Sequence, residues 1–153
     1  CASNGGVGRA GAMSPVRGDP LRTQFGRTRS HAERTLVVGD AAGLVSPLTG
    51  EGIAAAMESG EMAARHALRA LESGDFSAQA LAPYTRALRA RYGADHRAAR
   101  VVRMALMIPS LVNRVFRKLR RDDDVAREVG YVIIGHKSPR HLLRPCMLLR
   151  LMT

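Results

Sequence analysis

The hydrophobic pattern changes from a short extended run to long helical stretches within the first half of the chain. Residues 35–38 read Thr-Leu-Val-Val and end at Gly39-Asp40. A compact run of aliphatic and β-branched residues closed by glycine is typical of a strand buried on both faces. Residues 21–26 are a second, shorter candidate strand, and residues 40–50 are rich in turn formers. The sequence therefore predicts short strands followed by a loop.

Beyond this loop the apolar positions recur at helical spacing from residue 51 to residue 72. One face of the predicted helix carries Ile53, Met57, Ala64, Ala67, Leu68 and Leu71. Charged residues occupy the other face, as expected for an amphipathic helix. Gly74 stands just past its end, where a left-handed cap is expected. The many alanines indicate close packing, and we expect the helix to lie against a sheet.

The rest of the chain reads as helix interrupted by proline. Further helices are predicted over residues 78–107, 111–121, 122–134 and 139–152. Pro109 breaks the first of these, and Ser110 is placed to cap the next. The aspartates at 122–124 complement the dipole at the start of the third, and Pro145 is expected to bend the last. The predicted order is strand, loop, helix and then an all-helical tail.

Composition indicates a folded and strongly basic chain. The hydrophobic content is 46%, and the formal net charge is +11, with the arginines concentrated over residues 86–121. Such a charge attracts nucleic acid or an anionic membrane surface, unless it is only a solvated arginine-rich face. Aromatic residues make up only 4%. Because single-stranded nucleic acid is bound largely by stacking on aromatic side chains, we expect no nucleic-acid partner.

Several other classes of site find no support in the sequence. The two cysteines, Cys1 and Cys146, form neither a disulfide framework nor a metal pair. The histidines lack the spacing of zinc ligands, so no metal site is expected. No run reaches the roughly 20 apolar residues that span a bilayer. Residues 6–11 match the dinucleotide string G-x-G-x-x-G, but no strand precedes them and Pro15 follows closely, so the match carries little weight.

The chemistry-bearing residues gather between the predicted strand and the first helix. A buried strand delivers Asp40 to its carboxyl end, where open α/β sheets bind ligands. A carboxylate there accepts charge-assisted hydrogen bonds from sugar-type hydroxyls. Pro47 stiffens the turn, and Gly50 and Gly52 let the backbone approach a planar ring. The tip of the following helix, at Ile53, favours developing negative charge.

This segment resembles the second flavin-binding motif of the geranylgeranyl reductase family, within the class of flavoproteins built like para-hydroxybenzoate hydroxylase. The resemblance rests on residues 39–43 (GDAAG), 47–53 (PLTGEGI) and 59–60 (SG). Gly43 stands where aromatic hydroxylases usually carry histidine, which favours the reductase branch. Because the chain opens with Cys1 in a loop-like stretch, it is expected to be the C-terminal part of a longer protein.

The resemblance implies a fold and a set of cofactor contacts. The fold class is α/β, with residues 1–75 ending an FAD-binding Rossmann-like domain and residues 76–153 forming a helical region. Gly39 and Asp40 would hold the ribityl chain of FAD, with Ala41 too small to obstruct it. The turn that passes beside the isoalloxazine ring would comprise Pro47, Leu48, Gly50 and Gly52. The N–H groups of Ile53 and Ala54 would face the flavin C2 carbonyl. No residue of the chain is a convincing proton donor, so the catalytic residues stay unassigned.

The resemblance also implies an activity, namely FAD-dependent saturation of C=C bonds in an isoprenoid lipid chain, with an external electron donor. Such an enzyme would be cytoplasmic, with peripheral contact to the inner face of the membrane. The C-terminal run over residues 141–152 is amphipathic and either anchors on anionic lipid or packs on the domain. Two alternatives stay open. One is a flavin-dependent monooxygenase or halogenase with the same cradle, and the other is a basic helical module without catalysis.

Overall fold

The structure is a computed structural model that describes residues 23–152, apart from residues 24 and 28. The expectation for residues 6–11 lies outside the described residues, as does half of the candidate strand at 21–26, of which Phe25 and Gly26 are described and lie in a turn. Elements follow one another along the chain as β1 (His31–Ala32), β2 (Thr35–Leu36), η1 (Gly39–Ala42), α1 (Ile53–Ser73), α2 (Ala78–Ala105), α3 (Pro109–Leu119), α4 (Asp123–Ile133), η2 (Pro139–Leu143) and α5 (Pro145–Met152). The described part is therefore mostly helical with a small sheet.

The sheet is a two-stranded antiparallel hairpin in which His31 pairs with Leu36 and Ala32 with Thr35. The predicted buried strand over residues 35–38 is wrong in length and in burial, because β2 ends at Leu36 and Val38 is 38% exposed. A strand becomes buried on both faces only when layers cover both sides of its sheet. Within the described residues β2 has a single strand neighbour, and the chain turns into the 3-10 helix η1 directly afterwards.

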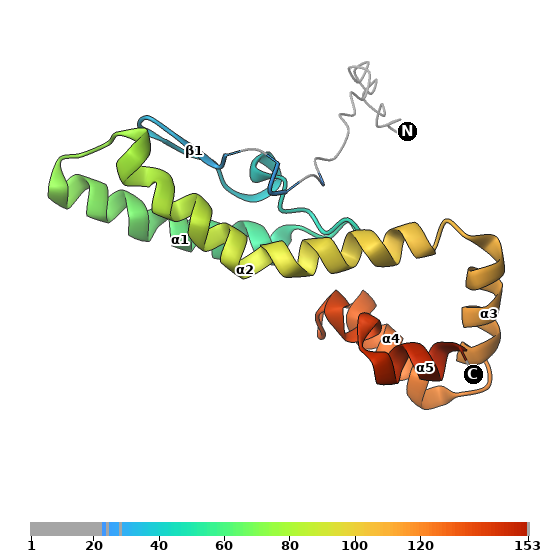
Figure 1. The fold of residues 1–153 in the computed structure, drawn as a ribbon. Helices are drawn as coiled ribbons and strands as arrows, with labels where there is room; N and C mark the ends of the chain where they lie inside the picture. The colour runs from blue at the N-terminus through green and yellow to red at the C-terminus, as the bar shows by residue number, and fades with distance from the viewer. Residues whose placement is uncertain (1–22, 24, 28, 153) are drawn as a thin grey trace, which may run out of the picture.

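Helices α1 and α2 run antiparallel, side by side, and the hairpin lies along the same pair (Figure 1). The predicted bounds of α1 are confirmed to within two residues, and Gly74 caps it in the left-handed region with φ +69°. The alanine side of α1 packs mainly on α2 and η1, and its Ala67 and Ala70 also line a hollow together with Leu36 of β2. Its larger apolar side chains, Ile53, Met57, Leu68 and Leu71, are exposed.

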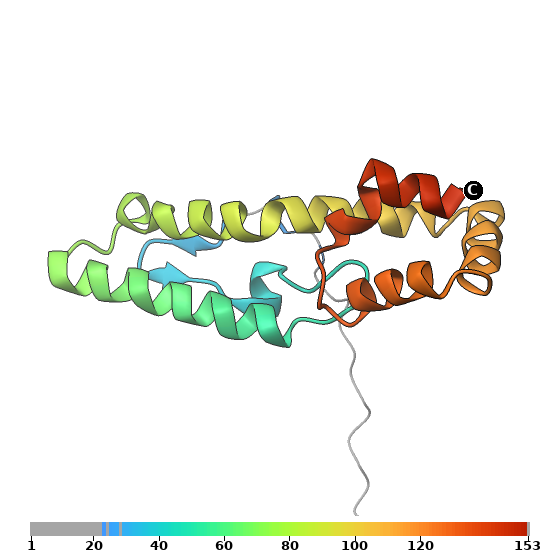
Figure 2. The same ribbon diagram turned by 90° about the horizontal axis from the view of Figure 1, so that it is seen from below.

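Helix α3 crosses the far end of α2, and the remaining helices fold back from it (Figures 1 and 2). Pro109 is the first residue of α3, so the prediction that Ser110 caps this helix is wrong. Proline suits the first helical position because the N–H that it lacks would have no partner there. The predicted last helix is interrupted at extended Arg144, which separates η2 from α5 as the following Pro145 requires. No helix of the described residues is long and apolar enough to cross a membrane.

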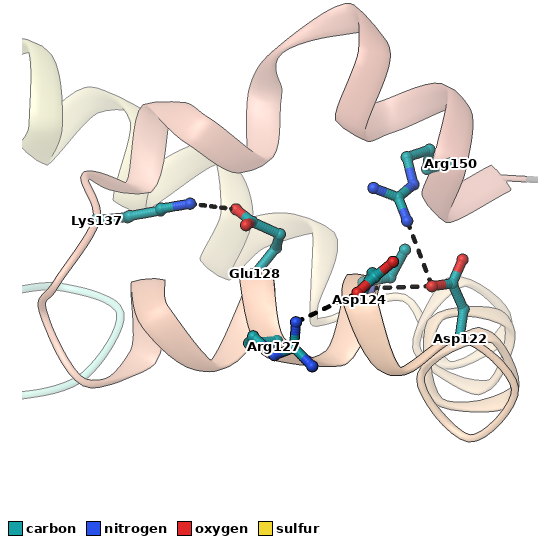
Figure 3. A network of polar contacts seen from close by, with 7 residues as sticks. Asp122, Asp124, Arg127, Glu128, Lys137 and Arg150 are labelled. Atoms are coloured by element: carbon teal, nitrogen blue, oxygen red, sulfur yellow. Dashed lines mark hydrogen bonds and ion pairs between the residues drawn. The ribbon is translucent and has the colours of Figure 1, made fainter.

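Polar contacts hold the terminal helices together (Figure 3). Asp122 caps α4 by accepting a hydrogen bond from the N–H of Val125 at 3.1 Å, which confirms the predicted helix start. The same carboxylate pairs with Arg150 of α5 at 3.3 Å. Lys137 pairs with Glu128 of α4 at 2.6 Å. These contacts tie the segment after α4 and the last helix back onto α4.

The described residues form two apolar cores. The first joins the hairpin side of the molecule to α1 and α2 and contains Phe25, Ala42, Leu44, Ala63, Tyr84, Leu88 and Tyr92. The second lies among the terminal helices and contains Val125, Val132, Leu142 and Met147. Leu48, from the loop between η1 and α1, packs against the second core. The loop with the predicted site residues therefore lies between the two cores.

Candidate functional site

The turn that carries Asp40 is anchored on α1 by a buried serine. The Gly39 N–H donates to Ser59 Oγ at 3.0 Å, and this hydroxyl donates to the Ala56 carbonyl at 3.1 Å. Gly39 has φ +53°, and a Cβ at this position would lie 3.0 Å from Ala56 Cβ. Glycine is thus required at residue 39 both for the left-handed backbone and for the close approach to the helix.

Tyr84 of α2 fixes the segment that leads into this turn. Its hydroxyl donates to the Val37 carbonyl at 2.9 Å and lies 3.4 Å from the Ser59 carbonyl. The side chain is fully buried, and burial raises the pKa of Tyr84 to about 12. The phenol therefore remains a neutral donor throughout the physiological range. Sequence reasoning missed this role of Tyr84, and it included Ser59 only as part of the family motif.

The Asp40 carboxylate points to the N-terminus of α1. A Cβ added to Gly52, the N-cap of α1, would lie only 2.8 Å from Asp40 Oδ1 and 3.4 Å from Val45 Cγ2. A larger residue at position 52 would push the carboxylate away, so the glycine is what lets the two groups meet. Asp40 is exposed, and no described residue donates a hydrogen bond to its carboxylate. The carboxylate is therefore open to a ligand beside the helix tip.

The tip of α1 itself offers unpaired donors. The first backbone N–H groups of a helix have no partner within it, and no side chain caps α1 in the described part of the chain. Ile53 and Ala54 begin the helix, and both are exposed. Positive partial charge at this end favours an anion or a group that gains negative charge. A carboxylate and a set of backbone donors thus face one region, with hydroxyl groups or a partly anionic ring as suitable ligands.

The loop between η1 and α1 is closed on itself. Ser46 N donates to the Glu51 carbonyl at 2.8 Å, and Gly50 N donates to the Ser46 carbonyl at 2.9 Å. Gly50 has φ +75° and open space where a Cβ would stand. Pro47 is buried and Leu48 half-buried. The structure thus brings Gly39, Asp40 and Ala41 next to Gly52, Ile53 and Ala54, with Pro47, Leu48 and Gly50 on the adjoining loop.

A cavity of about 460 Å³ lies against the same loop and was not predicted from the sequence. Its lining comes from the loop, from the first turns of α1, from α2 and from the segment after α4, including Leu48, Glu51, Ala54, Tyr92, His96, Lys137 and Arg140. Asp40 is not part of this lining. Three predicted site residues, Pro47, Leu48 and Ala54, line this cavity, which lies where the loop meets the terminal helices.

Most charged groups around this cavity are paired within the protein. Glu58 accepts hydrogen bonds from the Tyr92 hydroxyl at 2.5 Å and from Arg91 at 2.7 Å, and these contacts lower the pKa of Glu58. Asp95 pairs with Arg140 at 2.7 Å. His96 is buried, which lowers its pKa, and its Nδ1 has no hydrogen-bond partner among the described residues. Because these charges pair with one another, the cavity wall mainly holds neighbouring segments of the protein together.

Replacing Ser59 by alanine should destabilise the site without changing its surface. The substitution leaves the buried N–H of Gly39 without an acceptor, and an unsatisfied buried donor costs about 1–3 kcal/mol. We expect a matching fall in the free energy of unfolding, measured by urea denaturation followed by circular dichroism. Ser110→Ala, at an exposed serine, is the control and should change stability by less than about 0.5 kcal/mol. Equal stability of the two variants would contradict the anchoring role.

Comparison with known proteins finds relatives that share one enzymatic name. The digeranylgeranylglycerophospholipid reductase of Methanospirillum hungatei is 40% identical over 92 residues, which are 60% of this chain and 21% of the relative. Digeranylgeranylglycerophospholipid reductase 3 of Methanosphaera stadtmanae is 43% identical over 67 residues, which are 44% of this chain and 16% of the relative. Over the matched residues this chain is similar to the geranylgeranyl reductases.

The similarity to geranylgeranyl reductases covers part of each protein. The chain spans about a fifth of the length of the reductases that it matches. It is also 32% identical over 134 residues to conditioned medium factor receptor 1 of Dictyostelium discoideum, which covers 85% of this chain and 26% of that relative. No protein-family model matches the chain, and no solved structure matches it. The likeness to the reductases therefore rests on sequence similarity over part of each protein.

Proposed function

We propose that the intact protein is an FAD-dependent oxidoreductase that reduces C=C bonds in an isoprenoid lipid chain. The observation that carries the proposal is the placement of the Asp40 carboxylate against the glycine tip of α1, where a Cβ would lie 2.8 Å from Asp40 Oδ1. The names of the related reductases support the substrate class. In this proposal the described residues form part of a cradle for the flavin.

The residues present fit the riboflavin portion of FAD. Asp40 would accept hydrogen bonds from ribityl hydroxyls, and charge-assisted bonds of this kind are the strong ones. Gly39 and Ala41 flank it without bulk, and Gly52 leaves the space between carboxylate and helix free of a side chain. Pro47, Leu48 and Gly50 would border the ring. The Ile53 and Ala54 N–H groups would face the flavin C2 carbonyl.

The bound flavin would supply a hydride to one carbon of the alkene, while a proton would reach the other carbon. The task of this chain would be to orient the cofactor and to favour negative charge near the α1 tip, where helix N–H groups and the helix dipole act together. An external electron donor would be needed to reduce the flavin again. We propose a cytoplasmic protein with peripheral membrane contact, because an isoprenoid lipid partitions into the bilayer.

The test is reconstitution of the intact protein. Purified protein should be yellow with flavin absorbance, and under reducing conditions it should add pairs of hydrogen atoms to a geranylgeranyl-bearing lipid, as read by mass spectrometry. Incorporation of oxygen or halogen into an aromatic substrate, with no saturation of the lipid, would favour a monooxygenase or halogenase. A colourless protein that stays colourless after incubation with FAD would overturn the cofactor assignment.

A further inference from the structure

Helix α3 presents a row of arginines that lack acidic partners. Arg114, Arg117 and Arg120 are spaced three apart and therefore share one side of the helix. All three are exposed, and none forms an ion pair with a described residue. With Ser110, Asn113 and Phe116 they line an open hollow of about 590 Å³. This side of α3 is a concentrated patch of unneutralised positive charge, on a chain whose net charge is +11.

Exposed apolar side chains lie next to this patch. Met107 is 77% exposed and Ile108 51% exposed in the turn directly before α3. Met104, Leu106 and Phe116 are also exposed. The opposite side of α3 is the one that packs, since Leu119 contacts the second core. The helix thus buries one face and leaves a face with both cationic and apolar groups uncovered.

The position of α3 places its arginines and the neighbouring apolar side chains at one end of the molecule. Helix α3 forms one end of the elongated molecule, across the end of α2 (Figures 1 and 2). The apolar turn and the arginine row lie at that same end, because Pro109 follows the turn directly and begins α3. A broad surface approaching this end would meet both groups together.

We propose that this end of the molecule, residues 104–120, docks on the surface of a bilayer that contains anionic phospholipid. Arginine guanidinium groups match the geometry of phosphate oxygens, and basic residues near a membrane are attracted by its negative surface potential. Methionine, isoleucine and phenylalanine side chains at the same end would enter the boundary between headgroups and acyl chains. This inference stands apart from the proposed reaction, since a protein that binds lipid need not reduce it.

Nucleic acid fits this surface less well than lipid. Binding of unpaired bases depends on stacking against aromatic side chains, and Phe116 is the single aromatic residue among the described residues 104–120. The neighbouring exposed groups are methionine, leucine and isoleucine, which have no ring on which a base stacks. Such side chains gain more from transfer into an acyl layer than from contact with bases.

The experiment measures binding of the intact protein to vesicles of phosphatidylcholine with and without phosphatidylglycerol. The variant Arg114→Gln/Arg117→Gln/Arg120→Gln should lower partitioning onto the phosphatidylglycerol vesicles roughly a hundredfold. The matched control Arg69→Gln/Arg86→Gln/Arg97→Gln removes the same charge from exposed positions on α1 and α2 and should stay within about twofold of the parent. Met107→Ser/Ile108→Ser should weaken the binding that persists at high salt.

Several results would overturn the proposal. Equal losses in the two arginine variants would mean that net charge alone drives the binding. Equal binding to vesicles with and without phosphatidylglycerol would exclude an anionic-lipid surface. Loss of oligonucleotide binding in the α3 variant, with vesicle binding unchanged, would assign the patch to nucleic acid. Circular dichroism checks the fold, and if the triple variant does not fold, Arg117→Gln alone should lower vesicle partitioning about fivefold.

Discussion

Replacing Asp40 by alanine in the intact protein is expected to weaken the retention of FAD by at least about tenfold. A hydrogen bond to a charged group contributes about 1.5–3 kcal/mol, and each 1.4 kcal/mol is a factor of about ten in affinity. The Asp40 carboxylate lies beside the α1 tip and accepts no hydrogen bond from the described residues. Its removal should therefore lower the affinity for FAD and leave the stability of the fold unchanged. The dissociation constant, measured by flavin fluorescence on titration of the apoprotein, tests this expectation.

The control for Asp40 is Asp123→Ala. Asp123 is an exposed carboxylate in the first turn of α4, so its removal changes net charge by the same amount at a position away from the loop. We expect FAD affinity to be unchanged in this variant. If Asp40→Ala retained FAD as well as Asp123→Ala does, the carboxylate would not contact the cofactor, and the cradle as described would be wrong.

Leu88→Ala should lower the free energy of unfolding by more than Ser59→Ala does. Leu88 is fully buried in the first core, among Tyr84, Tyr92 and Leu44. Truncating a buried leucine removes apolar contacts and leaves a cavity, which together cost about 2–5 kcal/mol. Because Ala42 and Leu44 of this core belong to the segment that carries Asp40, the site should loosen as well. The urea midpoint, followed by circular dichroism, should fall by about 1 M or more.

The matched control for this stability effect is Leu106→Ala. Leu106 lies after the end of α2 and is 48% exposed, so its truncation removes the same atoms from a site that water already reaches. We expect a change below about 1 kcal/mol, as for most substitutions on the surface. A similar urea midpoint in the two variants would show that the core around Leu88 is not closely packed.

Features set by neighbouring residues could be predicted from the sequence. The glycine cap at residue 74 and the aspartate cap at residue 122 lie where the local signals place them. Helix α1 runs over Ile53–Ser73, close to the predicted 51–72. These features depend on backbone geometry within one or two helical turns, and the residue types that satisfy that geometry are few. The turn-forming residues over 40–50 likewise predicted the loop before α1.

Contacts between distant residues could not be predicted in this way. Ser59 bonds Gly39 across 20 residues, and Tyr84 bonds Val37 across 47 residues. No periodicity of the chain indicates which buried hydroxyl will find which backbone group. The misassigned strand at residues 35–38 has a related cause, because β-branched residues show only that a segment suits a sheet, whereas its burial depends on which layers surround it.

The separate core of the terminal helices has a consequence for motion. Elements with few contacts to the rest of a protein open in local cooperative steps, at lower free energy than global unfolding. Helices α4 and α5 close around Val125, Val132 and Met147 and reach the long helices mainly through η2, which packs on α2, so we expect α4 and α5 to open as such a unit about η2. Leu48 packs against it. Each opening of the tail would uncover Leu48 and release the turn beside it, so fluctuations at the C-terminus would reach the loop next to Asp40.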